Sequence, residues 1–224
     1  MLKSFGEPKA IDYFCPMKQS EVQSEAIPTE ERIKNAAREV FLEKGYEGAT
    51  TREIADRAGM NRALMNYYFR SKEKLFNAIF EEELKRVVKG MQTVLATDLP
   101  LKEKIVALIN NEFNLLTERQ HLACFILQES STKPELYGPS MRKVFMKALT
   151  LFSKQVQEAV QAGIIRPISA EHLIHLIRTV NWTLFMEKAV LMQIHQLNEQ
   201  TFQQFALEFK QASTEILIHG LFLK

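Results

Sequence analysis

The sequence predicts an all-α protein, with a short three-helix head that carries a helix-turn-helix and a larger helical body after it. Glycine and proline, the usual turn residues, number only 8 and 7 among 224 residues, so long uninterrupted segments are expected. Apolar residues recur at helical spacing through most of the chain after Thr29. No segment shows the turn-flanked alternation of a β-hairpin.

The predicted helices of the head begin at capping residues and end at glycines. Thr29 opens the first helix and Gly45 ends it. Thr50 opens the second, with Glu53 three residues later in the capping-box arrangement. Because Gly59 follows closely, this second helix is short.

Two more caps and a series of breaks predict the remaining helices. Asn61 opens a short third helix through Phe69, and Ser71 opens a much longer fourth one with an apolar stripe. Pro134 and Gly163 interrupt the later pattern. The predicted helices of the body lie near 100–118, 121–131, 139–162, 169–195 and 198–221.

Composition excludes several classes of protein. Hydrophobic residues make up 46% and charged residues 25%, which is ordinary for a globular chain and too apolar for a disordered one. No apolar run approaches the ~18 residues of a membrane span, and Cys15 and Cys124 make no disulfide framework. We therefore expect a cytoplasmic protein with no membrane partner.

The first segment, residues 1–26, is expected to be a flexible tail without a signal peptide. Translation could equally start at Met17, because that start would remove the Cys15 thiol and no predicted core residue.

Residues 50–69 have the properties of a helix-turn-helix. Two short helices flank a tight turn at Gly59, and Ala55 is small where the helices must approach. From the turn alone, an ordinary helical corner is an equally good interpretation. The distribution of charge favours the helix-turn-helix. The segment from Thr50 to Lys74 holds six basic and three acidic residues, in a chain whose net charge is only +2. Such clusters suit phosphates, although many are merely solvated surface.

The run from Thr29 to Phe80 closely resembles the DNA-binding domain of TetR-type transcriptional regulators. The resemblance rests on Phe41-Leu42-Glu43-Lys44-Gly45-Tyr46, Thr50, Ile54-Ala55, Ala58-Gly59-Met60, Tyr68-Phe69 and Lys72-Glu73-Lys74-Leu75. It implies a DNA-binding domain at 27–87, with its motif at 50–69, and a ligand-binding and dimerisation domain at 88–224.

The resemblance also implies which residues meet double-stranded DNA. They lie at the start of the second helix, along the third and at the start of the fourth: Thr51, Arg52, Asn61, Arg62, Ala63, Leu64, Asn66, Tyr67, Tyr68 and Lys72.

Their chemistry agrees with this role. Arg62 can donate a pair of hydrogen bonds to guanine, and Ala63 and Leu64 can contact a thymine methyl. Thr51, Arg52, Lys72 and the two tyrosines suit phosphates. Asn66 stands where the family most often has tyrosine; it either reads adenine or is a plain surface residue.

By the same resemblance, the body should hold a cavity for a small apolar or amphipathic effector. Candidates for its wall are Met91, Phe113, Phe125, Phe145, Met146, Leu149, Phe152, Trp182 and Met186. The alternative is that most of these side chains form core. The last two predicted helices would pair with their copies in a homodimer, and their wide apolar surface favours this.

We therefore predict a DNA-binding transcriptional regulator, a ligand-released repressor that binds a pseudo-palindromic operator as a homodimer. An activator or a partner-controlled member of the family is the alternative. A helical metal or ligand carrier is a weaker one, since His172 and His175 have a possible ligand spacing but no third ligand nearby. The sequence shows no catalytic or cofactor motif, so we expect no enzyme, no cofactor and no metal site.

Overall fold

The computed structural model describes residues 28–137 and 139–223, and in this part of the chain it is helical with a single isolated β-bridge between Ile165 and Phe222. The helices are α1 (Thr29–Gly48), α2 (Thr51–Ala58), α3 (Arg62–Tyr68), α4 (Lys72–Leu95), α5 (Leu101–Glu118), α6 (Leu122–Thr132), a 3₁₀ turn (Pro134–Tyr137), α7 (Pro139–Gln161), α8 (Ala170–Met186), α9 (Lys188–Ile194) and α10 (Glu199–Leu221). The predicted all-α fold class is confirmed. The predicted tail, with Cys15 and Met17, lies outside the described residues.

One predicted boundary was partly right and another was wrong. The helical backbone breaks at Gly45, with φ of 67° and ψ of −175°, as predicted, but α1 resumes beyond this kink and continues to Gly48. The single helix expected at 169–195 is divided at Glu187, whose φ of −90° and ψ of 3° interrupt the helical ladder between α8 and α9. The other predicted helices agree with the structure to within a few residues.

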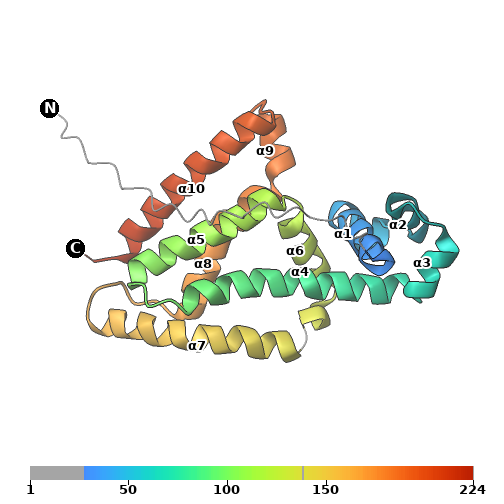
Figure 1. The fold of residues 1–224 in the computed structure, drawn as a ribbon. Coiled ribbons are helices and arrows are strands. Elements are labelled where there is room, and N and C mark those ends of the chain that lie inside the picture. The colour runs from blue at the N-terminus through green and yellow to red at the C-terminus, as the bar shows by residue number, and fades with distance from the viewer. Residues whose placement is uncertain (1–27, 138, 224) are drawn as a thin grey trace, which may run out of the picture.

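Helices α1, α2 and α3 gather around the first half of α4 and form the head of the molecule (Figure 1). Their shared core contains fully buried side chains from all four helices: Ile33, Phe41, Ile54, Met65, Phe76 and Ile79. Burial of one such side chain contributes about 1.5–3 kcal/mol. The short helices α2 and α3 therefore depend on this packing more than on their own propensity.

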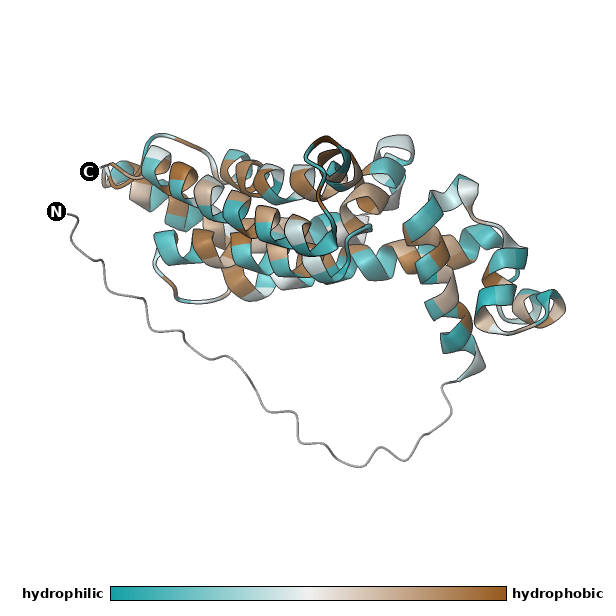
Figure 2. Cartoon of the chain, turned by 90° about the horizontal axis from the view of Figure 1, so that it is seen from above, coloured by the Kyte–Doolittle hydropathy of each residue, from teal (hydrophilic) through white to brown (hydrophobic). Residues whose placement is uncertain are grey.

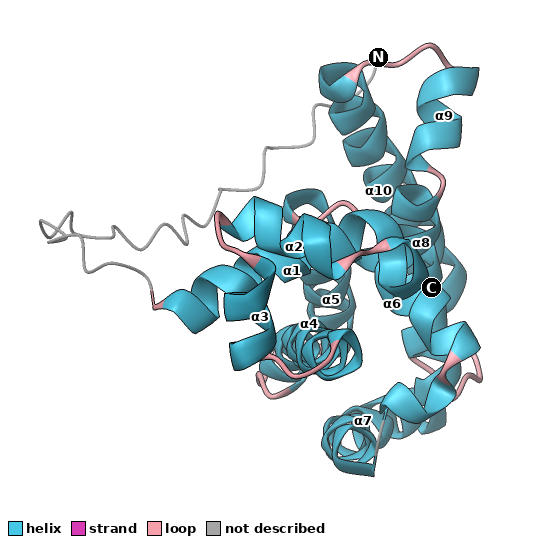
Figure 3. Cartoon of the chain, turned by 90° about the vertical axis from the view of Figure 1, so that its right-hand side faces the viewer, coloured by secondary structure: helices cyan, strands magenta, loops and turns pink. Residues whose placement is uncertain are grey.

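The body packs α5 between α4 and α8, with α7 along the outer side of α4 and α8 (Figures 1 and 3). Polar and apolar residues alternate along these helices, so that each helix presents one face of each kind (Figure 2). In the described part of the chain, no helix combines the length and apolar character needed to cross a membrane.

Helix α4 belongs to both parts, and Glu83 in its middle joins them. Its side chain is completely buried. One carboxylate oxygen lies 2.9 Å from Nε of Arg38 on α1, and the other lies 3.0 Å from Nη1 of Arg119, directly after α5. A second joint lies nearby, because the carboxylate of Glu129 on α6 accepts a hydrogen bond from the backbone N–H of Tyr46 at 2.7 Å.

We predict that Glu83→Ala lowers the free energy of unfolding by about 3 kcal/mol, since it leaves Arg119 without its carboxylate and Arg38 with Glu82 alone. Glu81→Ala, two residues earlier on α4, is the control; it removes an exposed pair with Lys85 and should cost less than 1 kcal/mol. Urea unfolding of both variants measures the difference. Equal losses would contradict the role of Glu83.

Candidate functional site

Helix α2 and its turn are fixed by local hydrogen bonds that the sequence encodes. The hydroxyl of Thr50 accepts from the N–H of Glu53 at 3.2 Å. Gly59 takes a left-handed conformation, φ 66° and ψ 38°, and its N–H bonds back to the end of the helix. A β-carbon at Gly59 would also stand 3.4 Å from Nη2 of Arg32, which donates to the carbonyl of Ala58. Glycine is therefore required at this turn.

Helix α3 is anchored by one side chain and exposes the rest. Met65 is 1% exposed and packs into the head. Asn61 caps the helix by accepting from the N–H of Leu64 at 2.8 Å. The other side chains face outward, and Tyr67 is 80% exposed. Such a protruding helix, held at its base, has the size and freedom to enter a major groove.

The structure brings the predicted DNA-contacting residues onto one end of the head, but they differ in exposure and in hydrogen bonding. Arg52, Asn61, Arg62, Ala63, Leu64, Asn66, Tyr67 and Tyr68 are exposed, and Thr51 is half-buried. Lys72 points inward: its ammonium group donates to the carbonyls of Tyr46 at 2.7 Å and Ala49 at 3.0 Å. One of its three N–H groups remains for a phosphate.

Of the basic residues in this segment, Arg57 is already paired. Its guanidinium donates to both carboxylate oxygens of Glu43, at 2.8 and 2.9 Å, and this contact lowers the pKa of Glu43. Arg52, Arg62, Arg70 and Lys74 stay exposed. The positive charge that faces outward therefore lies at the beginnings of α2, α3 and α4.

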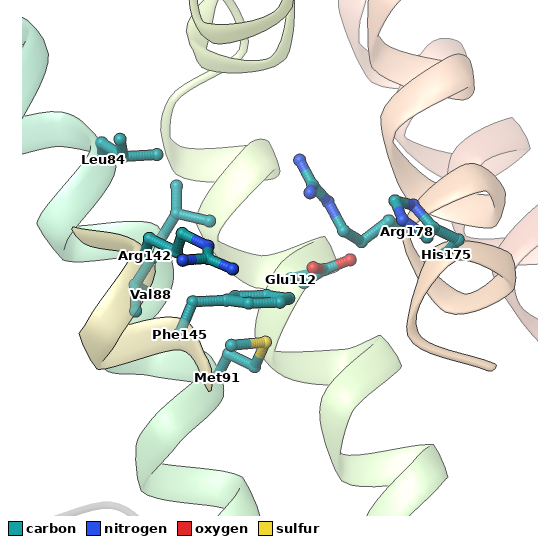
Figure 4. A pocket seen from close by; sticks show the side chains of 9 residues that line it. Leu84, Val88, Met91, Glu112, Arg142, Phe145, His175 and Arg178 are labelled. Atoms are coloured by element: carbon teal, nitrogen blue, oxygen red, sulfur yellow. The ribbon is translucent and has the colours of Figure 1, made fainter. Parts of the chain in front are cut away.

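The body contains a partly open cavity of about 420 Å³ between α4, α5, α7 and α8 (Figure 4). This volume lies in the range of pockets for small organic ligands. Its wall consists of Leu84, Val87, Val88 and Met91 from α4, Glu112 from α5, Arg142 and Phe145 from α7, and His175 and Arg178 from α8.

Glu112 is the unusual member of this wall. It is 7% exposed, and among the described residues its Oε2 atom has no hydrogen-bond partner. Burial raises its pKa from 4.5 to about 7, although Arg178, Asn181 and Trp182 oppose the rise. In Figure 4 its carboxyl group points toward the side of the cavity that carries Arg178 and His175. A buried polar atom without a partner requires an explanation such as a water or a ligand.

Comparisons with known proteins agree with the geometry of the head. A family model described as bacterial regulatory proteins, tetR family, matches residues 33–79. The HTH-type transcriptional regulator UidR of Escherichia coli (strain K12) is 29% identical over 150 residues, which cover 65% of this chain and 74% of UidR. The fatty acid metabolism regulator protein of Bacillus subtilis (strain 168) is 25% identical, covering 60% and 70% respectively.

Residues 33–79 thus match the DNA-binding part of the tetR family, and the chain is similar to transcriptional regulators over about two thirds of its length. Solved structures show the same fold along nearly the whole chain. The ketosteroid transcriptional regulator KstR2 of Mycobacterium tuberculosis has a TM-score of 0.64 at 16% identity and covers 89% of this regulator and 98% of its own chain. The fatty acid degradation regulator FadR of Bacillus halodurans has a TM-score of 0.57 at 21% identity, covering 86% and 96%.

The predicted wall residues of the regulator fall into three groups. Met91 and Phe145 line the cavity. Phe113, Phe125, Leu149, Phe152 and Trp182 are buried side chains that do not line it, and Phe113 lines a separate small hollow beside Phe202 on α10. Met146 and Met186 are exposed. Most of the predicted aromatic and apolar wall residues belong to the core instead.

The polar wall residues were missed, although the sequence carried a signal for Glu112. On α5 it interrupts an apolar stripe of Ile105, Leu108, Ile109, Phe113 and Leu116. An acid at a core position indicates either a buried partner or a ligand. His175, considered above as a metal ligand, lines the cavity. Among the described residues, no group of three or more metal-ligating side chains comes together.

We predict that Glu112→Gln removes a pH dependence of stability. Because the folded-state pKa of Glu112, about 7, exceeds its ordinary value of 4.5, the wild type should lose stability as pH rises from 4.5 to 7. The difference between these values corresponds to about 3 kcal/mol at ~1.36 kcal/mol per pH unit. In urea unfolding from pH 5 to pH 8, the free energy of unfolding of Glu112→Gln should rise relative to that of the wild type. Parallel curves would contradict this account.

Proposed function

We propose that this DNA-binding regulator is a homodimeric repressor that a small molecule in the α4–α5–α7–α8 cavity releases from a pseudo-palindromic operator. The observation that carries the proposal is the continuity of α4. Its first residue, Lys72, is bonded to the head, and Leu84, Val87, Val88 and Met91 line the cavity three turns later. The DNA-binding domain would be 27–87 and the ligand-binding and dimerisation domain 88–224, with α4 crossing the boundary.

The DNA contacts divide by chemistry. Arg62 at the first position of α3 is exposed and suits a guanine edge, whereas Arg52 at the start of α2 suits a phosphate. Asn66 is exposed on the same helix, which agrees equally with an adenine contact and with a plain surface residue. Several phosphate contacts per subunit also make operator affinity fall steeply with salt, by ~0.9 in log affinity per phosphate for each unit of log salt.

Exposed apolar side chains on the last helices support the homodimer. Ile216 is 74% exposed, and others gather on the same elements: Leu176, Met186, Val190, Ile194, Leu207 and Phe209. Leu173, Ile177, Leu184 and Phe202 of the same segments are buried within one chain. The outward set is more apolar surface than a lone chain usually leaves in water, and two copies would cover it around a two-fold axis.

Release would follow from different affinities of the effector for two positions of α4. A ligand that favours one packing of α4 against α5 and α7 shifts the head with it, because Glu83 and Glu129 tie α1 to the body. Activation remains the alternative, and it differs only in which position of the heads fits DNA.

We predict that Arg62→Ala weakens operator binding by about 1–3 kcal/mol and relaxes preference at one symmetric pair of positions. Arg52→Ala is the matched control, since it removes an exposed arginine from the neighbouring helix and should weaken all sequences alike. Binding to a set of singly substituted operators measures both. A uniform loss for Arg62→Ala would show that it reads no base.

The release mechanism itself is tested by reciprocity. Compounds that raise the midpoint of thermal unfolding are titrated against the free regulator and against its operator complex. A compound that weakens operator binding tenfold must bind tenfold more weakly to the complex, about 1.4 kcal/mol of coupling. Fluorescence of Trp182 supplies a signal, because its ring lies 4.2 Å below Arg178 of the cavity wall. Equal affinities for both states would exclude release by that compound.

A further inference from the structure

One side of the cavity carries an excess of cationic groups. Arg142 on α7 and Arg178 on α8 point inward from opposite walls, and His175 lies one turn before Arg178 (Figure 4). Neither arginine forms an ion pair within 4.0 Å with any described carboxylate. The guanidinium of Arg178 instead lies over the ring of Trp182 at 4.2 Å, which holds it at the edge of the cavity.

The opposite side of the same cavity is apolar. Leu84, Val87, Val88 and Met91 form a continuous strip along α4, and the ring of Phe145 faces it from α7. All four side chains of the strip are at most 9% exposed. An occupant that satisfies both sides must have an apolar portion and a polar head.

Three buried polar atoms lie together beside the polar side and have no hydrogen-bond partner among the described residues: Oε2 of Glu112, Oδ1 of Asn181 and Nε1 of Trp182. Asn181 and Trp182 are both nine-tenths buried or more, and both act on the carboxyl of Glu112. Native proteins seldom leave such atoms unpaired. Of the three residues, Glu112 lines the cavity, so its carboxyl group marks the place where the polar group of a ligand would bond.

The charged groups around the cavity indicate the charge of the ligand's polar group. One carboxyl group, Glu112, faces two arginines and a histidine, and burial favours its protonated form. A protonated carboxyl can donate a hydrogen bond to an anion. A cationic group would instead meet two guanidinium groups, and a neutral one would leave the half-buried guanidinium of Arg178 without a counter-charge.

We propose that the effector is an amphipathic acid, with its anionic oxygens bound by Arg142 and Arg178 and its apolar portion lying against α4 and Phe145. This inference rests on the proposed function, because it names the class of ligand that the effector cavity takes. The acid group of the ligand would also contact Glu112, and its apolar portion would contact the turns of α4 that follow Glu83.

Calorimetric titration at pH 7 with three ten-carbon probes, decanoate, decanol and decylamine, tests the class of ligand. Decanoate should bind at least tenfold more tightly than the other two. Decyl phosphate, added as a fourth probe, distinguishes a phosphoric head from a carboxylic one, and tighter binding of either acid supports the proposal. Decanol or decylamine binding as tightly as the acids, or no binding by any of the four, would overturn it.

Two substitutions locate the head group. Arg142→Gln and Arg178→Gln should each weaken decanoate binding about tenfold and change decanol binding less than twofold. Lys143→Gln, the neighbouring exposed cation on α7 that does not line the cavity, should change neither. Arg142 is exposed, so its variant should fold even if loss of the Arg178–Trp182 contact disturbs the other. Unchanged decanoate affinity in Arg142→Gln would overturn the assignment.

Operator affinity, measured with each probe, separates this inference from the proposed function. Decanoate that binds with the expected preference yet leaves operator affinity unchanged would overturn release and leave the class of ligand standing. Decanol that binds more tightly than decanoate and weakens operator binding would overturn the class of ligand and leave release standing.

Discussion

The buried carboxylate of Glu83 needs cationic partners, and this need determines how the head and the body of the regulator are joined. Glu83 is completely buried, and placing an unpaired charge there would cost several kcal/mol. Arg38 from the head and Arg119 from the body satisfy it on opposite oxygens. A movement of α4 that separates Glu83 from both arginines would leave it only the longer contact with Arg86 at 3.7 Å, so such a movement is opposed and α1, α4 and the end of α5 are coupled.

In the proposed mechanism, this constraint connects the cavity to the DNA-binding head. Leu84, the first cavity residue of α4, directly follows Glu83 in sequence, so a ligand presses on the same helical turn that holds the joint. From there to Lys72 at the head is about 18 Å of continuous helix, at ~1.5 Å per residue. A small tilt at the cavity therefore becomes a larger displacement at α3, without requiring the head itself to change its packing.

The sequence was sufficient for the helices and the DNA-binding head because their signals are local. Thr50, Gly59, Asn61 and Ser71 act on backbone groups within a few residues, and the structure shows each of them doing so. The joint between head and body depends on partners far apart in the chain: Arg119 reaches Glu83 across 36 residues, and the bond from Tyr46 to Glu129 spans 83. The cavity likewise takes its wall from four helices between Leu84 and Arg178.

For the buried acids, the sequence indicates a special environment but not which kind of environment it is. Glu83, Glu112 and Glu129 each interrupt an apolar stripe, which indicates that each has a special environment. Nothing local distinguishes the two that join head to body from the one that faces a cavity. Aromatic content was a poor guide, since Phe125, Phe152 and Trp182 supply core rather than wall.

The proposed DNA contacts and the proposed ligand contacts share a helix but no side chain. The proposed DNA contacts end at Lys72, and the cavity wall begins at Leu84. Between them lie the core of the head and the Glu83 joint. Substitutions on α3 can therefore change which operator is read, and substitutions at Arg142 or Arg178 can change which ligand is bound, each without disturbing the other. The joint has no such freedom, because Glu83 must keep cations from both sides whatever the DNA sequence or the ligand.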